Sequence, residues 1–461
     1  MRRGRGTWVL AAVLVGSFAA RGAAANDLLQ LYHLAQNHDA TLQAALAQRD
    51  AAIEAKPLAL AALLPQVSAN ASAERLRTGD ELLGPTVAGT TITGCQIAAG
   101  AANEVCFGDA HGYGLSLSQT LWSFQSFSQL REANATAASA EATLLAAQQS
   151  LMLRVAQAYF GILAARDVLA TNQREREAYG TQLKQARGRQ QTGVGTRGDA
   201  EQAQAYYDAT QQAVIDSQNA LDDAELLMTE VTGSPAGNIA PLRDRIPLEA
   251  PDPASVDDWV SAALKDNPTV RAAQLQVDAT DRDIDVQRGK GLPSVAVTGG
   301  RTRAFQDLTI GGNQADDQIG VTLTWPLFQG GAVASEIRQS RANWKQALAL
   351  YAGAQRDAER LTRSSYRNVV TGISRIAAAR RYVDSAGVSV AASQRSLEFS
   401  LSSAAEFQLL SAQTLYYGAQ NLYSQTRYDY LTALLTLKQQ AGRLSEADLV
   451  AIDALLTEHT P

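Results

Sequence analysis

Leu115-Ser-Leu-Ser-Gln-Thr-Leu-Trp122 and Val321-Thr-Leu-Thr-Trp-Pro-Leu-Phe328 are two versions of one pattern, 206 positions apart. Each alternates apolar with polar or small residues and ends on an aromatic side chain. Further pairs repeat at similar offsets: Tyr159 and Tyr366, Gly233 and Gly442, Pro65 and Pro293, and Asn37 and Asn267. A nearly constant offset over hundreds of residues predicts a duplicated structural unit.

The first copy carries an insertion. The offset falls from 228 at Pro65 to 206 at Leu115, so about 22 extra residues lie between its two alternating segments. This position predicts an exposed hairpin tip, which tolerates insertion. The only two cysteines of the chain, Cys95 and Cys106, lie there. We expect them to form a disulfide after export; two free thiols in a flexible loop are the alternative.

The N-terminus has the three parts of a secretory signal peptide. Three arginines lie among the first five residues, residues 8–20 are apolar, and Ala23-Ala-Ala25 resembles a cleavage site. We predict cleavage after Ala25, which makes Asn26 the first residue of the mature chain. The residue directly after this site is Asn26 and not a cysteine, so a lipid-anchored N-terminus is not expected.

Composition excludes several classes of function. The mature chain carries 36 basic against 46 acidic residues, a balance that does not suit nucleic acid. The four histidines have no metal-ligand spacing, and no nucleophile, base and orienting group form a catalytic set. We therefore expect neither an enzyme nor a cofactor. Only 6% of residues are aromatic, which suits long helices packed through small residues.

Periodicity predicts the same elements in both copies: a helical region, two strands, a long helix and a shorter helix. The first copy has helical periodicity over 27–63, strands over 65–76 and 113–121, and helices over 124–191 and 199–232. The second copy has strands over 293–302 and 318–327. A helix of 68 residues is about 100 Å long, and the two shorter helical regions stacked end to end match it.

Each long helix carries a seam of apolar or small residues at spacings of three and four, which predicts coiled-coil packing. The seam of the second copy is smaller and more polar, so we expect looser packing there. The first seam is Leu144, Leu151, Val155, Ala158, Ile162, Ala165 and Leu169; the second is Tyr351, Gln355, Ala358, Thr362, Ser365, Val369, Gly372 and Ile376.

These patterns divide the chain into five parts. The expected parts are a signal peptide (1–25), a first repeat (26–233), a linker or belt (234–255), a second repeat (256–442) and a C-terminal tail (443–461). The linker region is irregular because residues 233–255 hold five of the twelve prolines.

Four alternating strands on long rods indicate a membrane conduit. An open sheet cannot lie in lipid because its edge groups would have no hydrogen-bond partners, so several chains must pool their strands. Trp122 and Trp325 stand at the junctions of strand and helix, where an aromatic girdle meets the membrane interface. The alternative for both tryptophans is ordinary packing between hairpin and helix.

The chain resembles the TolC-type outer-membrane efflux proteins over its whole mature length. The resemblance rests on the order and duplication of individually weak motifs. These are Gln119-Thr-Leu-Trp122, Trp325-Pro-Leu-Phe-Gln-Gly-Gly331, Asn267-Pro268, Gly195-Thr-Arg197 with Ala203-Gln204, Arg427-Tyr-Asp-Tyr-Leu431 and the stretch from Leu437 to Leu449.

The resemblance implies an α+β membrane protein of a Gram-negative bacterium. It implies a homotrimer in which four strands per chain form one 12-stranded β-barrel in the lipid of the outer membrane, continuous with a periplasmic helical coiled-coil barrel. It also implies a passive exit duct for secreted proteins, peptides or small toxic molecules. The implied partners are a periplasmic adaptor (membrane fusion) protein and an inner-membrane ABC or proton-driven pump.

The resemblance places the narrowest part of the periplasmic entrance at Glu406, Gln408 and Ser411. The family has two aspartates here, whereas this chain has Gln408 and Ser411 at the matching positions, and Glu406 is the only acid nearby. We therefore expect an entrance that binds cations weakly. A different class remains as the alternative: a periplasmic coiled-coil adaptor or scaffold, which would have the rods but no use for lipid-compatible strands.

Overall fold

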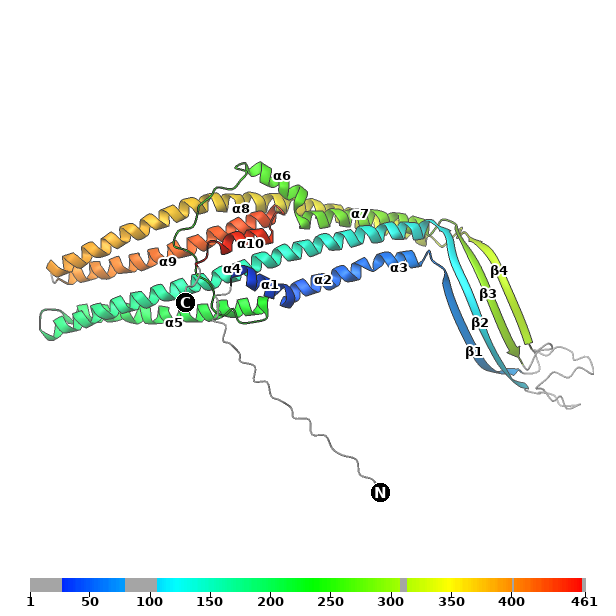
Figure 1. Cartoon of the computed structure of the whole chain (residues 1–461), viewed down its shortest axis with the longest axis horizontal. Helices are drawn as coiled ribbons and strands as arrows, with labels where there is room; N and C mark the ends of the chain where they lie inside the picture. The colour runs from blue at the N-terminus through cyan, green and yellow to red at the C-terminus, as the bar shows by residue number, and fades with distance from the viewer. Residues whose placement is uncertain (1–26, 79–105, 307–312, 400–401, 458–461) are drawn as a thin grey trace, which may run out of the picture.

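The computed structural model describes residues 27–78, 106–306, 313–399 and 402–457, except the side chains of 76–78, 106–108, 306 and 313. The chain is a long helical rod with a four-stranded sheet at one end (Figure 1). Among the described residues, none of the helices combines the length and the apolar character that a membrane span requires.

The two copies contain the same elements in the same order, which confirms the duplication. The first copy comprises α1 (Leu28–His38), α2 (Ala40–Ile53), α3 (Ala55–Ala61), β1 (Gln66–Thr78), β2 (Cys106–Ser123), α4 (Phe124–Gln191) and α5 (Arg197–Thr232). The second comprises α6 (Val256–Asp266), α7 (Pro268–Gly289), β3 (Ser294–Gln306), β4 (Asn313–Thr324), α8 (Ala332–Phe399) and α9 (Ser403–Gln440). A last helix, α10 (Glu446–Asp453), follows.

The first helical region is three helices, and the prediction of one continuous helix over 27–63 was wrong. The break between α1 and α2 lies at Asp39, whose backbone is extended and whose carboxylate accepts from the backbone N–H of Leu42 at 2.7 Å. Asp39 also forms a bidentate pair with Arg154 of α4, at 2.8 and 2.9 Å. Burial raises the pKa of Asp39, but the bonds from Arg154 and Leu42 outweigh it, and the net pKa is lowered. The capping bond and the ion pair both require the break.

The same break occurs in the second copy. Asn267 caps α7 by accepting from the N–H groups of Thr269 and Val270. Asp39 precedes Asn267 by 228 positions, the offset that also relates Pro65 to Pro293. The structural counterpart of Asn267 is therefore Asp39, and the expected match with Asn37 was wrong by two positions.

The long helices are as long as predicted. α4 and α8 have 68 residues each, about 100 Å of helix. α1, α2, α3 and α5 pack along α4, and α6, α7 and α9 pack along α8, as the length argument predicted. α4 also contacts α7 and α9 of the second copy, so it joins the two halves (Figure 1).

The predicted seams lie at these helix contacts. In α4, Leu151, Val155, Ala158 and Ile162 are buried, whereas Leu144, Ala165 and Leu169 are half-buried. In α8, the six seam positions from Ala358 onward are all buried: Ala358, Thr362, Ser365, Val369, Gly372 and Ile376. Thr362 has no hydrogen-bond partner for its hydroxyl among the described residues, a sign of the polar seam expected in this copy.

One close contact repeats in the two coiled coils, which are the pair α4 and α5 and the pair α8 and α9. A Cβ added at Gly180 of α4 would lie 3.3 Å from the ring of Tyr207 on α5. A Cβ added at Gly387 of α8 would lie 3.4 Å from the ring of Tyr416 on α9. In each copy a tyrosine ring packs against the surface left by a glycine, which brings the paired helices close together.

The sheet has the order β1-β2-β3-β4, with antiparallel neighbours throughout. β4 ends at Thr324, earlier than the predicted Leu327, and Pro326 lies in the stretch that does not pair because proline has no backbone N–H to donate. The main hydrophobic core lies about halfway along the rod, where α1, α4, α9, α10 and the irregular segment 234–255 meet. The hydroxyl of Tyr159 in this core donates to the carbonyl of Ala240 at 2.7 Å.

Candidate functional site

The sheet has one apolar and one polar face. On the apolar face, Val297 pairs with Val321, Val295 with Leu323, and Leu117 lies beside Gly299. The residues that alternate with these along the strands lie on the opposite face, where Ser118, Thr298 and Gly320 form one row. Ile319, Val321 and Leu323 are exposed by 85%, 68% and 65% in the single chain. Side chains this apolar need a nonaqueous neighbour, and lipid fits a face that is continuous along the strands.

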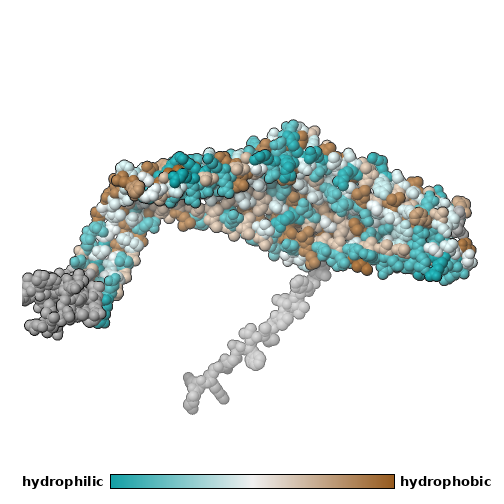
Figure 2. Space-filling view, turned by 180° about the vertical axis from the view of Figure 1, so that it is seen from behind, coloured by the Kyte–Doolittle hydropathy of each residue, from teal (hydrophilic) through white to brown (hydrophobic). Residues whose placement is uncertain are grey.

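The two tryptophans lie at the rod end of this sheet. Trp122 belongs to β2 and lies opposite Val295, and Trp325 directly follows β4. They are 43% and 59% exposed, so neither is packed into a core between hairpin and helix within the chain. Figure 2 shows hydrophobic residues gathered where sheet and rod meet. The girdle role of Trp122 and Trp325 stays a prediction that these exposures favour.

Ala25 and Asn26, the predicted cleavage site, lie outside the described residues, as do Cys95 and the side chain of Cys106. The disulfide therefore remains a prediction from the sequence. We expect mass spectrometry of protein purified without reductant to find Cys95 and Cys106 joined, because export places them in an oxidising compartment. Two alkylated thiols under the same conditions would refute it. Cys95→Ser with Cys106→Ser should assemble normally, since Cys95 belongs to the insertion and Cys106 is the first residue of β2, at the tip of the hairpin.

The segment expected to line the entrance begins α9, at the end of the rod farthest from the sheet. Ser402 caps this helix by accepting from the N–H of Ala405 at 3.3 Å. Gln408 is exposed and Ser411 half-buried, but Glu406 is only 4% exposed. Glu406 turns away from the other two side chains and forms an ion pair with Arg189, near the end of α4. Its Oε1 has no hydrogen-bond partner among the described side chains and backbone.

This ion pair is the outermost of several polar links between α4 and α9. Nearer the core, the buried hydroxyl of Tyr179 donates to the carbonyl of Leu410 at 3.3 Å and shares a hydrogen bond of 2.7 Å with Thr414. Burial raises the pKa of Tyr179 far above its usual range, so this hydroxyl stays protonated. Tyr417 of α9 in turn donates to the carbonyl of Arg174 at 3.4 Å.

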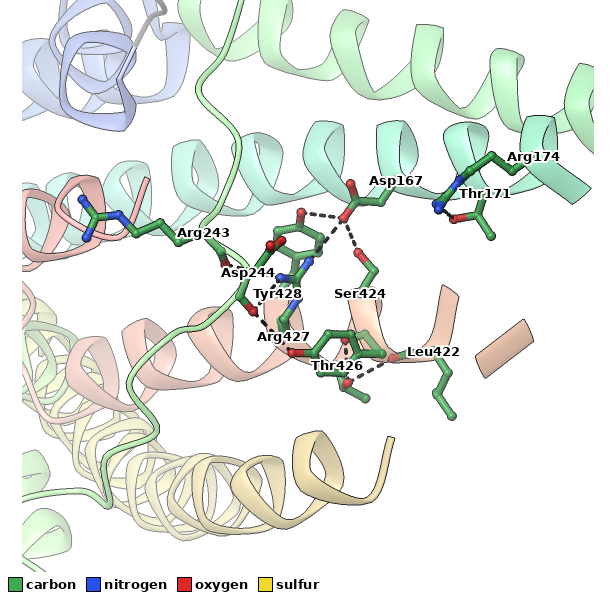
Figure 3. A network of polar contacts seen from close by, with 11 residues as sticks. Asp167, Thr171, Arg174, Arg243, Asp244, Leu422, Ser424, Thr426, Arg427 and Tyr428 are labelled. Carbon is green, nitrogen blue, oxygen red and sulfur yellow. Dashed lines mark hydrogen bonds and ion pairs between the residues drawn. The ribbon is translucent and has the colours of Figure 1, made fainter. Parts of the chain in front are cut away.

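The innermost link is a network around Asp167 of α4 (Figure 3). The carboxylate of Asp167 accepts from the hydroxyl of Ser424 and, at 2.8 Å, from that of Tyr428; the guanidinium of Arg427 lies 3.6 Å away. Burial and the charge of Asp167 raise the pKa of Tyr428. Arg427 also donates to the carbonyls of Arg243 and Asp244 at 3.4 Å, which ties the irregular segment 234–255 to α9.

The two coiled coils are thus held together at several levels. At the free end, the ion pair between Arg189 and Glu406 is joined by a hydrogen bond from the hydroxyl of Ser403 in α9 to the carboxylate of Asp199 in α5. Sequence reasoning missed both Arg189 and Asp167. A signal was present: Asp167 is four residues from the buried Leu163 and Thr171, and Arg189 is three from the buried Ala186. A charged residue three or four positions from buried residues lies on the same helix face as they do. Its charge then needs a partner on the neighbouring helix.

Comparison with known proteins agrees with this architecture. The profile of the family described as Outer membrane efflux protein matches residues 31–234 and 259–443, that is, both copies. Alkaline protease secretion protein AprF of Pseudomonas aeruginosa is 28% identical over 452 residues, covering 97% of this chain and 90% of AprF. Outer membrane protein TolC of Vibrio cholerae is 28% identical over 435 residues, covering 93% of this chain and 94% of TolC.

Solved structures share the fold. A membrane protein from Pseudomonas aeruginosa superposes with a TM-score of 0.74 at 20% identity, covering 90% of this chain and 93% of its own. The outer membrane protein VceC from Vibrio cholerae gives 0.72 at 17% identity, covering 90% and 96%. These likenesses concern the fold, and the family match covers most of the sequence. The chain therefore belongs to the outer membrane efflux protein family, as an outer-membrane exit duct that extends into the periplasm.

Proposed function

We propose that three copies of this chain form a passive duct from the periplasm to the outside. The observation that supports it is the direct join of an apolar-faced sheet to a rod of about 100 Å. β1 and β4 each have one unpaired edge within the described sheet, which lipid does not tolerate. Pairing β4 of one copy with β1 of the next closes the sheet, and three copies give twelve strands.

The duct needs an inner-membrane pump and a periplasmic adaptor, because nothing in the rod supplies energy. Relatives named for protease secretion, AprF and the PrtF protein of Dickeya chrysanthemi, support protein export as the cargo class. We therefore propose an ABC-type pump as the energy source. A periplasmic adaptor or scaffold role for the chain itself is less favoured, because Ile319, Val321 and Leu323 would face water.

Reconstitution in planar bilayers tests the duct. Purified protein should insert as trimers and give stepwise ionic conductance, and native mass spectrometry of the same sample should give three times the mass of one chain. Disrupting the gene should block release of proteins exported with the help of an ABC pump. A monomer that gives no conductance steps would favour the scaffold role. A conducting trimer whose loss affects only small-molecule resistance would keep the duct and refute the cargo.

The entrance should be insensitive to cations. Strong binding of a hard divalent ion needs several converging carboxylates, but Glu406 is already paired with Arg189, and Gln408 and Ser411 carry no charge. We expect millimolar divalent cations on the periplasmic side to leave single-channel conductance almost unchanged. Gln408→Asp with Ser411→Asp should create a block, and Gln408→Asn with Ser411→Asn is the uncharged control. Strong block of the unmodified channel would contradict this assignment.

A further inference from the structure

The apolar face of the sheet ends abruptly at its outer side. Along β4 and the residues after it, every second residue from Ile319 to Leu327 is apolar and exposed. From Ile319 to Leu323 this face lies within β4, about 14 Å along the strand, and Trp325 and Leu327 continue it in the unpaired stretch after β4. The next position of the same face is Asp317. The boundary of the band therefore lies between Ile319 and Asp317.

Asp317 belongs to a charged cluster that two strands supply. It pairs in register with Arg301 of β3, whose Nε lies 3.2 Å from its carboxylate. Arg303, two residues further along the same face, lies 3.7 Å from the same carboxylate oxygen. The Arg303 side chain is 24% exposed and the other two more than 60%, so the cluster lies open on the surface of the sheet.

Aromatic side chains accompany this cluster. Tyr113 of β2 lies opposite Arg303, and the ring of Phe305 stacks on that of His111 with centroids 4.9 Å apart and planes at 13°. Tyr113 and Phe305 are 6.4 Å apart. Amphipathic rings beside charged groups are typical of the level at which acyl chains meet headgroups.

The charges of the cluster do not balance. Two guanidiniums, Arg301 and Arg303, share the single carboxylate of Asp317. Arg75 and Asp109, 4.0 Å apart on the same face, contribute one charge of each sign. Asp316 alternates to the opposite face. Among the side chains that the structure describes on this face, one positive charge per chain is thus left over on a surface that borders lipid, where an unpaired charge is costly.

We propose that Arg301 and Arg303 bind the phosphate of an outer-leaflet lipid headgroup, which supplies the missing negative charge. Guanidinium groups suit phosphate because their N–H donors match its oxygens in pairs. The cluster lies towards the end of the sheet away from the helices (Figure 1), and hydrophilic residues mark this end in Figure 2. Since the helices extend into the periplasm, this end faces the outer leaflet. The proposal rests on the proposed membrane-inserted trimer.

The test measures binding of lipopolysaccharide to the detergent-solubilised trimer by native mass spectrometry and thermal shift. Wild-type protein should prefer lipopolysaccharide to the same lipid with its phosphates removed. Arg303→Gln should weaken binding roughly tenfold, the size of one charge-assisted hydrogen bond. Asp317→Asn should tighten it, because both arginines then lack a carboxylate. Arg360→Gln, which changes an exposed arginine of α8, should have no effect.

Opposite effects of Arg303→Gln and Asp317→Asn are the signature of an anion site. A purely structural ion pair would make both variants worse, and that result would overturn the proposal. Equal binding of the dephosphorylated lipid would also overturn it. So would inorganic phosphate that binds as tightly as the lipid, since the site would then recognise a free ion. Conductance of the trimer does not depend on this site. A wild-type trimer that conducts normally but shows no preference for the phosphorylated lipid would therefore refute this inference and leave the proposed duct intact.

Discussion

Val297→Arg and Leu323→Arg should prevent stable assembly in the membrane, whereas Thr298→Arg and Thr322→Arg should be tolerated. Val297 and Leu323 lie on the apolar face of the sheet, and the two threonines lie on the other. An arginine facing lipid near the midplane costs about 2–4 kcal/mol, and each trimer would carry three copies. The threonine positions face the wet interior of the proposed barrel, where a charge stays hydrated.

The measurement is the fraction of protein that migrates as a heat-modifiable trimer in detergent extracts of outer membranes. Each apolar-face variant has its matched control one residue away in the same strand, so differences in expression or export are shared. If the two faces responded equally, the apolar face would not be the lipid face, and the barrel assignment would fail.

Arg189→Met should separate the ends of the two coiled coils and increase single-channel conductance. The variant leaves the carboxylate of Glu406 buried without its partner. Breaking a buried ion pair from one side costs about 3–5 kcal/mol, because an uncompensated charge remains in a poorly hydrated place. The smallest movement that removes this free-energy cost is a shift of the start of α9 away from α4, which lets water reach Glu406.

The double variant Arg189→Met with Glu406→Leu distinguishes charge from packing. It removes both charges, so it should restore most of the closure that the single variant loses. Arg197→Met is the matched control, because Arg197 pairs with Glu201 on an exposed helix surface, where such pairs contribute little. Wild-type conductance and thermal stability in Arg189→Met would show that the pair does not hold the entrance.

The amino-acid pattern by itself determined the four strands, the long helices and their duplication, but not the breaks within the shorter helical regions or the last helix, α10. The alternation at Leu115–Trp122 and Val321–Phe328 predicted strands that the structure contains, although β4 ends at Thr324, and the helix predicted over 124–191 has the bounds of α4. Such features are local: side chains two apart share a strand face, and those three or four apart share a helix face. The constant offset then implied that each element occurs twice. The break at Asp39 escaped notice because neither a glycine nor a proline marks it in the sequence.

The partners across the fold were decided only by the tertiary structure. Glu406 stood out in the sequence as the single acid near the entrance, yet its charge is matched by Arg189, 217 positions earlier. Likewise the shared carboxylate of Asp317 depends on the register between β3 and β4. A periodic pattern states which face a residue occupies, but not which residue of another element faces it. That depends on how far each helix or strand is shifted and rotated against its neighbour, and packing of the whole chain sets both.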